Sequence, residues 1–428
     1  MRKIILIALA TSFLSNIWAQ SVNQELKTDF NKAGSNYYIY PVPTKPLTPA
    51  PHGKKPFYIS HYGRHGSRYL INQREYDYPY ATLKEADRAG KLSDRGKLVL
   101  QHVAQLRDEA KGRLGDLTSI GAEQHCGIAE RMFRNYPEVF KGDACVEAKS
   151  TVVTRCIISM DNALRTLAAL NPKLRITSDA SEHDMYYMNL QDRKLYHQKW
   201  PAKATALYED YCTRHSIHEK AMLRLFNDSV YAREDINLYR LNLQMMKLAS
   251  SVQGTKLGRQ FSLFDEVYTL DELYHNWLQL NAFWYVAYGN CPFNGGTQPF
   301  VQRNLLRNII TEADSCIALQ RPGATLRFGH ETIVLPLVCL LGLNGFDQQV
   351  DNLEYLEARG WINYRVFPMA ANLQIVFYRK NPTDKDVLVK VLLNEMEAEL
   401  PLPTDSAPYY HWDDFKAYYL EKLASYKE

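Results

Sequence analysis

Short apolar runs alternate with helical patterns in the first part of the chain, residues 54–179. Runs of strand length lie at 57–60, 145–149 and 174–177. Apolar residues at helical spacing lie at 117–140 and 156–170, which is typical of amphipathic helices. Strands that alternate with helices in this way predict a parallel sheet with crossover helices.

The pattern changes over residues 180–321, where apolar positions recur every three to four residues and strand signals are few. The three longest such segments are 220–251, 270–289 and 300–319. Several aromatic residues fall in this part, and we interpret most of them as packing residues. The segment is therefore predicted to be a mostly helical insertion.

The last part of the chain, residues 322–428, again contains both strand and helix patterns. A strand is expected at 324–328, followed by a helix from about Glu331. Residues 372–378 and 387–393 flank a turn-forming stretch and predict a hairpin, and 415–426 predicts a terminal helix. The expected fold is α/β, with a mixed, mostly parallel sheet flanked by helices and an inserted mostly helical cap domain. The core would comprise 20–179 and 322–428, and the cap would comprise 180–321.

The N-terminus has the order of a secretory signal peptide. Arg2 and Lys3 precede a mostly apolar stretch at 4–18, and Ala19 supplies a small residue for cleavage before Gln20. A buried N-terminal helix is the less favoured alternative. No later apolar run has the length that a membrane helix needs, the longest being 333–343. We therefore expect a protein that is periplasmic or secreted, with no membrane span once the signal peptide at 1–19 is cleaved.

Composition narrows the class of protein. The chain has 428 residues, of which 46% are apolar and 23% charged, which excludes a disordered chain or a small disulfide scaffold. The formal net charge is +4, which is much less basic than is usual for a nucleic-acid-binding protein, so this class is disfavoured. The seven cysteines include no C-x-x-C pair, so a zinc or thioredoxin-type site is disfavoured, and their odd number leaves at least one of them free.

The sharpest local feature is the segment 61–69, His-Tyr-Gly-Arg-His-Gly-Ser-Arg-Tyr, directly after the first predicted strand. In open α/β sheets, ligands bind at the carboxyl ends of strands. Arg64 and Arg68 flank His65, and arginine presents planar donors that match phosphate oxygens. Their charge also disfavours a protonated imidazole, which leaves a competent nucleophile. The alternative interpretation of this segment is a solvated basic loop.

Two further segments follow predicted strands. His330 and Glu331 open a predicted helix, where backbone N–H groups favour anions. His330 can contact a phosphoryl oxygen, and Glu331 beside a bound phosphate should have a raised pKa and can serve as a general acid. Arg155 lies between a strand and a helix and can add a phosphate contact. Taken alone, each would be an ordinary residue of a helix start; together the three segments favour a phosphate-transfer pocket.

These segments resemble the signature of the histidine acid phosphatases, the second branch of the histidine phosphatase superfamily. Arg64-His65-Gly66-Ser67-Arg68 resembles the family's nucleophile motif, and His330-Glu331-Thr332 resembles its distal His-Asp proton-donor motif. The stretch 117–121, with Gln124 and Arg131, resembles the family's helix entry, and 150–155 resembles the segment with its extra phosphate-binding arginine. Glu331 stands where the family usually has Asp. The segment resembles either His-Asp-Thr lengthened by a methylene or the His-Ala-Glu-Thr of the multiple inositol polyphosphate phosphatases with one residue missing. Arg68-Tyr69 also resembles that branch, although Leu70 replaces the proline that often follows, and we favour the multiple inositol polyphosphate phosphatases and phytases.

The resemblance implies a mechanism. His65 would attack the phosphorus and form a phosphohistidine. Arg64, Arg68, Arg155 and His330 would bind the phosphoryl oxygens, and Glu331 would protonate the leaving alcohol. No metal and no organic cofactor is implied. The expected substrate is a phosphorylated small molecule, and inositol polyphosphates such as phytate are favoured, with no nucleic acid as partner.

Other functions stay open. A broad-specificity acid phosphatase or a sugar phosphatase would use the same residues. A non-catalytic envelope protein that binds polyanions or glycans would not need both a nucleophile and a proton donor. A phosphoglycerate-mutase-like enzyme shares the Arg-His-Gly element, but the signal peptide and the large insertion count against it. The oligomeric state, the positional specificity and the cysteine pairing are not encoded in a readable pattern.

Overall fold

The structure is a computed structural model that describes residues 21–190 and 192–427. The predicted signal peptide at 1–19 lies outside these residues. None of the helices within the described ranges combines the length and the apolar character that a membrane span requires.

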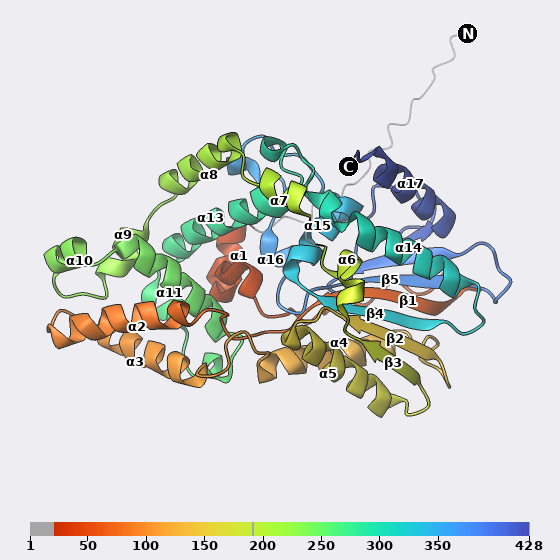
Figure 1. Ribbon diagram of the computed structural model, residues 1–428, viewed down its shortest axis with the longest axis horizontal. Helices are drawn as coiled ribbons and strands as arrows, with labels where there is room; N and C mark the ends of the chain where they lie inside the picture. Colours follow the sequence, from red (N-terminus) through yellow and green to blue (C-terminus); the bar gives the residue numbers. More distant parts are fainter. Residues whose placement is uncertain (1–20, 191, 428) are drawn as a thin grey trace, which may run out of the picture.

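One eight-stranded mixed sheet forms the centre of the fold (Figure 1). Its strands are β1 (Lys55–Arg64), β2 (Cys145–Ser150), β3 (Arg175–Asp179), β4 (Gly323–Gly329), β5 (Asn372–Arg379), β6 (Leu388–Leu393), β7 (Met396–Glu397) and β8 (Tyr409–His411). The order is β3-β2-β4-β1-β5-β6-β7, and β8 pairs with β6. The pairs β1–β4, β4–β2 and β2–β3 are parallel, whereas β5 is antiparallel to β1 and β6 is antiparallel to β5.

Five strands, β1, β2, β3, β4 and β6, therefore run in one direction, and the mixed, mostly parallel sheet expected from the sequence is confirmed. The predicted hairpin is also confirmed as β5 and β6. Every residue of β4, β5 and β6 is buried, and β6 appears in the sequence as a nearly continuous apolar run.

Helices cover both faces of the sheet (Figure 1). One face packs against α4 (Ser119–Asn135) and α5 (Thr154–Leu170) through a core that includes Val146 of β2 and Leu326 of β4. The opposite face packs against α14 (Arg303–Ile317), α15 (Glu331–Leu341) and α17 (Trp412–Ser425), with Tyr62 and Phe377 in that core.

A second, helical part lies beside the sheet (Figure 1). Its longer helices are α2 (Gln73–Arg88), α3 (Asp94–Glu109), α8 (Ala202–Arg214), α11 (Leu238–Val252) and α13 (Leu270–Tyr288). Shorter helices are α1 (Val22–Thr28), the 3-10 helix η1 (Phe30–Tyr37), α6 (Met185–Met188), α7 (Arg193–Gln198), α9 (His218–Leu223), α10 (Ser229–Asp235), α12 (Leu263–Val267) and α16 (Asn363–Val366). One hydrophobic core joins α2 and α3 to α11, α12 and α13. The helical part thus draws on two segments of the chain, while α14, within the expected insertion at 180–321, packs on the sheet.

Two local details differ from the sequence-based expectation. The helical pattern at 220–251 is divided into α9, α10 and α11, because the side chains of Asp228 and Asn237 accept backbone hydrogen bonds and start new helices. The first strand does not end at residue 60 but continues to Arg64. It continues because the polar residues 61–64 pair with β4 on one side and residues 61–63 pair with β5 on the other.

Candidate active site

The candidate site lies where β1 and β4 end. These strands pair in parallel, and Arg64 at the end of β1 is opposite Gly329 at the end of β4. The next residues, His65 and His330, therefore emerge side by side, with ring centroids 5.7 Å apart. The register of two neighbouring strands brings together segments that are far apart in the sequence.

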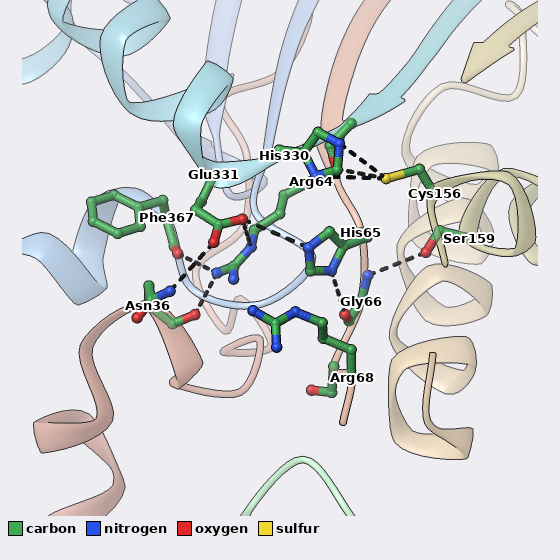
Figure 2. A network of polar contacts seen from close by, with 12 residues as sticks. Asn36, Arg64, His65, Gly66, Arg68, Cys156, Ser159, His330, Glu331 and Phe367 are labelled. Carbon is green, nitrogen blue, oxygen red and sulfur yellow. Dashed lines mark hydrogen bonds and ion pairs between the residues drawn. The ribbon is translucent and has the colours of Figure 1, made fainter. Parts of the chain in front are cut away.

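The imidazole of His65 is buried and held in one orientation. Its Nδ1 lies 2.8 Å from the carbonyl oxygen of Gly66, and because a carbonyl only accepts, Nδ1 carries the proton. The unprotonated Nε2 then faces the site, 3.6 Å from Oε2 of Glu331 (Figure 2). Burial and the neighbouring cations Arg64, Arg155 and Arg68 hold the pKa of His65 well below its usual range, so the ring is neutral.

Arg64 is the most firmly held cation of the site. It is fully buried, and its Nη1 donates to the carbonyl oxygens of Phe367, at 3.0 Å, and Asn36. Its Nε lies 3.1 Å from Oε2 of Glu331. Burial lowers the pKa of Arg64 to about 10, so the guanidinium stays charged at neutral pH. Its Nη2 is buried without a hydrogen-bond partner among the described residues.

Arg68 and Arg155 add two more guanidinium groups. Arg68 donates to the carbonyl oxygen of Tyr69 at 3.0 Å and lies over the ring of Tyr37, 5.1 Å from its centre. Arg155 stands in the first turn of α5. The Nε atoms of both arginines are buried and have no hydrogen-bond partner within the described parts of the chain. Buried, unpaired donors on cations are what an anionic ligand would satisfy.

His330 and Glu331 form the start of α15. His330 Nε2 lies 3.3 Å from the hydroxyl of Thr151, and burial lowers the pKa of His330 to about 4. Burial raises the pKa of Glu331, but Arg64, Arg68 and His330 outweigh it and lower this pKa to about 2. The free site therefore holds Glu331 as a carboxylate, and the raised pKa expected beside a bound phosphate stays a prediction.

One donor atom each from His65, His330 and Glu331 lies within 4.8 Å of the others, a spacing that a metal ion can use. Three guanidinium groups act on the same small volume, since Arg64, Arg68 and Arg155 all lower the pKa of His65. Their field opposes a cation and favours an anion. The electrostatics of the site therefore match a phosphate better than a metal ion.

Two glycines let the segment after β1 pack directly on helix α4. A methyl group on Gly66 would overlap the backbone of Gly121, and one on Gly121 would overlap the backbone of Ser67. Gln124 secures the same segment, since its Oε1 accepts from the Ser67 N–H at 2.9 Å and its Nε2 donates to the Ser67 hydroxyl at 3.0 Å. Of the motif residues noted in the sequence, Arg131 alone lies elsewhere and pairs with Glu395 at 2.7 Å.

All six predicted site residues gather at this place, but several supporting residues were not predicted. Asn36 accepts from Arg64 through its carbonyl oxygen, and its Nδ2 lies 3.4 Å from Oε1 of Glu331. The hydroxyl of Ser159 accepts from the Gly66 N–H at 3.2 Å (Figure 2). Contacts through backbone carbonyls leave no residue pattern, so Phe367 could not have been found. Asn36 and Ser159 also contact the site through their side chains, but neither belongs to a motif that directly follows a strand.

The seven cysteines are all free. Cys339 is buried in α15. Cys156 lies at the site, where its Sγ donates to the carbonyl oxygen of Gly329 at 3.2 Å and lies 3.8 Å from Nε2 of His330. Burial raises its pKa to about 11, so the thiol is neutral and acts as a packing and hydrogen-bonding group.

Comparison with protein families matches residues 63–394 to the model described as histidine phosphatase superfamily (branch 2). Comparison with curated proteins gives no significant match. Among solved structures, the multiple inositol polyphosphate phosphatase of Bifidobacterium longum in complex with inositol hexasulfate superimposes with a TM-score of 0.74 at 17% identity, covering 90% of this chain and 97% of that chain.

Two phytases have the same fold. The phytase from D. castellii gives a TM-score of 0.69 at 17% identity and covers 92% of this chain and 85% of its own. The Hafnia alvei phytase in complex with myo-inositol hexakis sulphate gives 0.54 at 12% identity, with coverages of 87% and 98%. At these identities the likeness concerns the fold.

Proposed function

The chain belongs to branch 2 of the histidine phosphatase superfamily, and on that premise we propose that it is a phosphomonoesterase acting on inositol polyphosphates through a phosphohistidine intermediate. One observation carries the proposal of phosphoryl transfer. The unprotonated Nε2 of a neutral, buried His65 faces a site to which three guanidinium groups contribute buried donors without partners. A nucleophile of this kind suits phosphorus once cations neutralise the oxygens around it.

In the first step, His65 Nε2 attacks the phosphorus and the bond to the ester oxygen breaks. Arg64, Arg68, Arg155 and His330 stabilise the charge on the non-bridging oxygens. The bond electrons remain on the ester oxygen, which takes a proton from Glu331. The substrate brings this proton into the site, because it binds as a phosphate monoester monoanion. Glu331 can hold the proton, since the bound anion weakens the effect of Arg64 and Arg68, which lower the pKa of Glu331 in the free site.

In the second step, Glu331 is a carboxylate again and accepts a proton from water. The water oxygen attacks the phosphorus, and the P–N bond to His65 breaks. Phosphate leaves as the dihydrogen phosphate monoanion, which takes the proton that Glu331 accepted from water, and Glu331 is a carboxylate again. Glu331 Oε2 lies 3.6 Å from His65 Nε2, so its carboxyl group is close to the bond that forms or breaks at phosphorus in both steps.

The choice of inositol polyphosphates is supported by the likeness to a phosphatase solved with inositol hexasulfate and to phytases, and by the Arg68-Tyr69 and His330-Glu331-Thr332 segments. The test is the product profile on phytate over time, with initial rates on glucose 1-phosphate and p-nitrophenyl phosphate. We expect stepwise loss of phosphate from phytate at the highest kcat/KM. A higher kcat/KM on glucose 1-phosphate would assign a sugar phosphatase instead.

Export is part of the proposal. The order of charged, apolar and small residues at 1–19 supports a signal peptide. Expression of the full chain in a Gram-negative host should give a periplasmic or secreted protein whose first residue is Gln20. A protein found in the cytoplasm with Met1 retained would contradict export.

Replacement of Arg155 by methionine should make the enzyme more sensitive to acid. The loss of a phosphate contact should lower kcat/KM by roughly 10- to 100-fold. Because Arg155 helps to lower the pKa of His65, its removal raises that pKa, and a smaller fraction of His65 is then neutral as the pH falls. The ratio of variant to wild-type kcat/KM on p-nitrophenyl phosphate should therefore decrease further from pH 7 to pH 5.

The matched control is Arg165→Met, since Arg165 is an exposed arginine on the same helix, α5, and pairs with Asp161 at 3.8 Å. This variant should keep wild-type kinetics at each pH. A ratio for Arg155→Met that stays constant between pH 7 and pH 5 would contradict the coupling of Arg155 to His65.

A further inference from the structure

The N-terminal segment, residues 29–38, reaches the candidate site from outside the part of the chain that matches the family, which is 63–394. Asn36 in η1 contacts two site residues. Its carbonyl oxygen accepts from Nη1 of Arg64, and its side-chain Nδ2 lies 3.4 Å from Oε1 of Glu331 (Figure 2). One residue therefore contacts a phosphate-binding cation through its backbone and the proposed proton donor through its side chain.

The backbone directly before Asn36 is held in an unfavourable conformation. Ser35 has φ 56° and ψ −117°, a positive φ that residues with a side chain rarely adopt. Ser35 is fully buried, and its hydroxyl accepts from Nδ2 of Asn363 at 2.8 Å. Oδ1 of Asn363 in turn accepts from Nε1 of Trp277 at 3.1 Å. A buried network therefore stabilises the conformation that places Asn36 at the site.

One glutamine holds both ends of η1. Gln253, at the end of α11, accepts from the N–H of Ile39 through Oε1 at 3.1 Å and donates through Nε2 to the carbonyl oxygen of Asn31 at 3.1 Å. A strained residue persists only where its surroundings enforce the strain, and such residues are typical of functional sites. The position of Asn36 is thus fixed in the free protein.

The two carboxyl oxygens of Glu331 have different neighbours. Oε1 lies next to the Asn36 amide, whereas Oε2 lies 3.6 Å from Nε2 of His65. Oε2 also forms an ion pair with Nε of Arg64 at 3.1 Å, but this Nε has no hydrogen-bond partner among the described residues. An amide NH2 group only donates, so the oxygen that it contacts stays an acceptor. A proton on Glu331 is therefore favoured at Oε2, on the side of the nucleophile.

We propose that Asn36 is a positioning residue for the proton donor. Its side chain orients the Glu331 carboxyl so that Oε2 carries the proton to the leaving alkoxide, while its carbonyl oxygen holds Arg64 independently of the side chain. This inference rests on the proposed phosphatase function. It assigns part of the proton transfer to a segment that none of the catalytic motifs includes.

Asn36→Ala removes the amide and keeps the carbonyl that binds Arg64. It should lower kcat/KM about tenfold on glycerol 2-phosphate, whose alkoxide needs a proton, and less than about twofold on p-nitrophenyl phosphate. Inhibition by inorganic phosphate should stay within about twofold of wild type. Asn36→Leu, of similar volume and without a donor, should give the same result. The matched control is Asn31→Ala on the same helix, because Asn31 contacts Asp29 and Gln253 through its backbone; it should keep wild-type kinetics.

A double-mutant cycle separates positioning from a structural role. In the Glu331→Gln protein, Asn36→Ala should change kcat/KM on glycerol 2-phosphate by less than about twofold, because the proton donor is already absent. An undiminished rate on glycerol 2-phosphate in Asn36→Ala, equal losses on the two esters, or the same tenfold loss in the Glu331→Gln protein would each overturn the inference and leave the phosphatase function intact. A wild-type protein that hydrolyses neither ester would instead refute the proposed function, and the inference with it.

Discussion

His65→Ala should lower the release of phosphate from both phytate and p-nitrophenyl phosphate by roughly 10⁴-fold or more. The reason is that, in the proposed mechanism, Nε2 of this ring forms the covalent bond to phosphorus, and alanine offers no atom to replace it. The loss should be the same for good and poor leaving groups, since no phosphoenzyme forms with either. Initial rates on both substrates, with the melting temperature of the variant, provide the measurement.

His183→Ala is the control, because His183 is an exposed histidine outside the site; it should keep wild-type rates. A quench in alkaline denaturant after mixing with labelled substrate should trap a phosphohistidine in the wild-type protein and none in His65→Ala. Undiminished turnover by a folded His65→Ala protein would refute the nucleophile. A wild-type chain that binds substrate without forming a phosphoenzyme would point to the non-catalytic alternative.

Glu331→Gln should separate substrates by their leaving groups. An alkoxide from phytate or glycerol 2-phosphate needs a proton as it leaves, so kcat should fall by roughly 10²- to 10⁴-fold on these substrates. p-Nitrophenolate is stable without a proton, so its release should fall much less. The ratio of the two kcat values, measured for the wild type and the variant, tests this expectation.

Glu331→Asp provides the matched control, since it keeps the carboxyl group and shortens its reach by one methylene. It should recover part of the activity on alkyl esters that Glu331→Gln loses. An equal loss on p-nitrophenyl phosphate and phytate in Glu331→Gln would mean that Glu331 holds Arg64 in place and donates no proton, because the two groups are only 3.1 Å apart.

The regular parts of the fold were predictable because a helix or strand with one buried face has apolar residues at a regular spacing in the sequence. The strands β2 and β4 and the helix α5 lie within a few residues of their expected ranges. The extension of β1 was missed, because its last residues are polar and are buried by pairing on both sides. The division of 220–251 was missed because Asp228 and Asn237 interrupt the backbone without interrupting the apolar spacing.

The residues of the candidate site were predictable for a different reason. Each segment directly follows a strand, and parallel strands place their carboxyl ends at one edge. What could not be predicted is the environment that sets their charges. The carboxylate state of Glu331 follows from its short distance to Arg64, whose charge outweighs the effect of burial, and neither the distance nor the burial is visible in a sequence.

The pairing of β1 with β4 has a consequence for how the protein is made. Tyr58 and Thr325, on facing strands, are separated by 267 positions in the chain. The nucleophile therefore emerges from the ribosome long before the proton donor, and a chain that ends before residue 323 carries His65 without its partner. Such non-local contacts form late and slowly. A site that needs both His65 and Glu331 can therefore be complete only after the segment that forms β4 and the start of α15 has been synthesised.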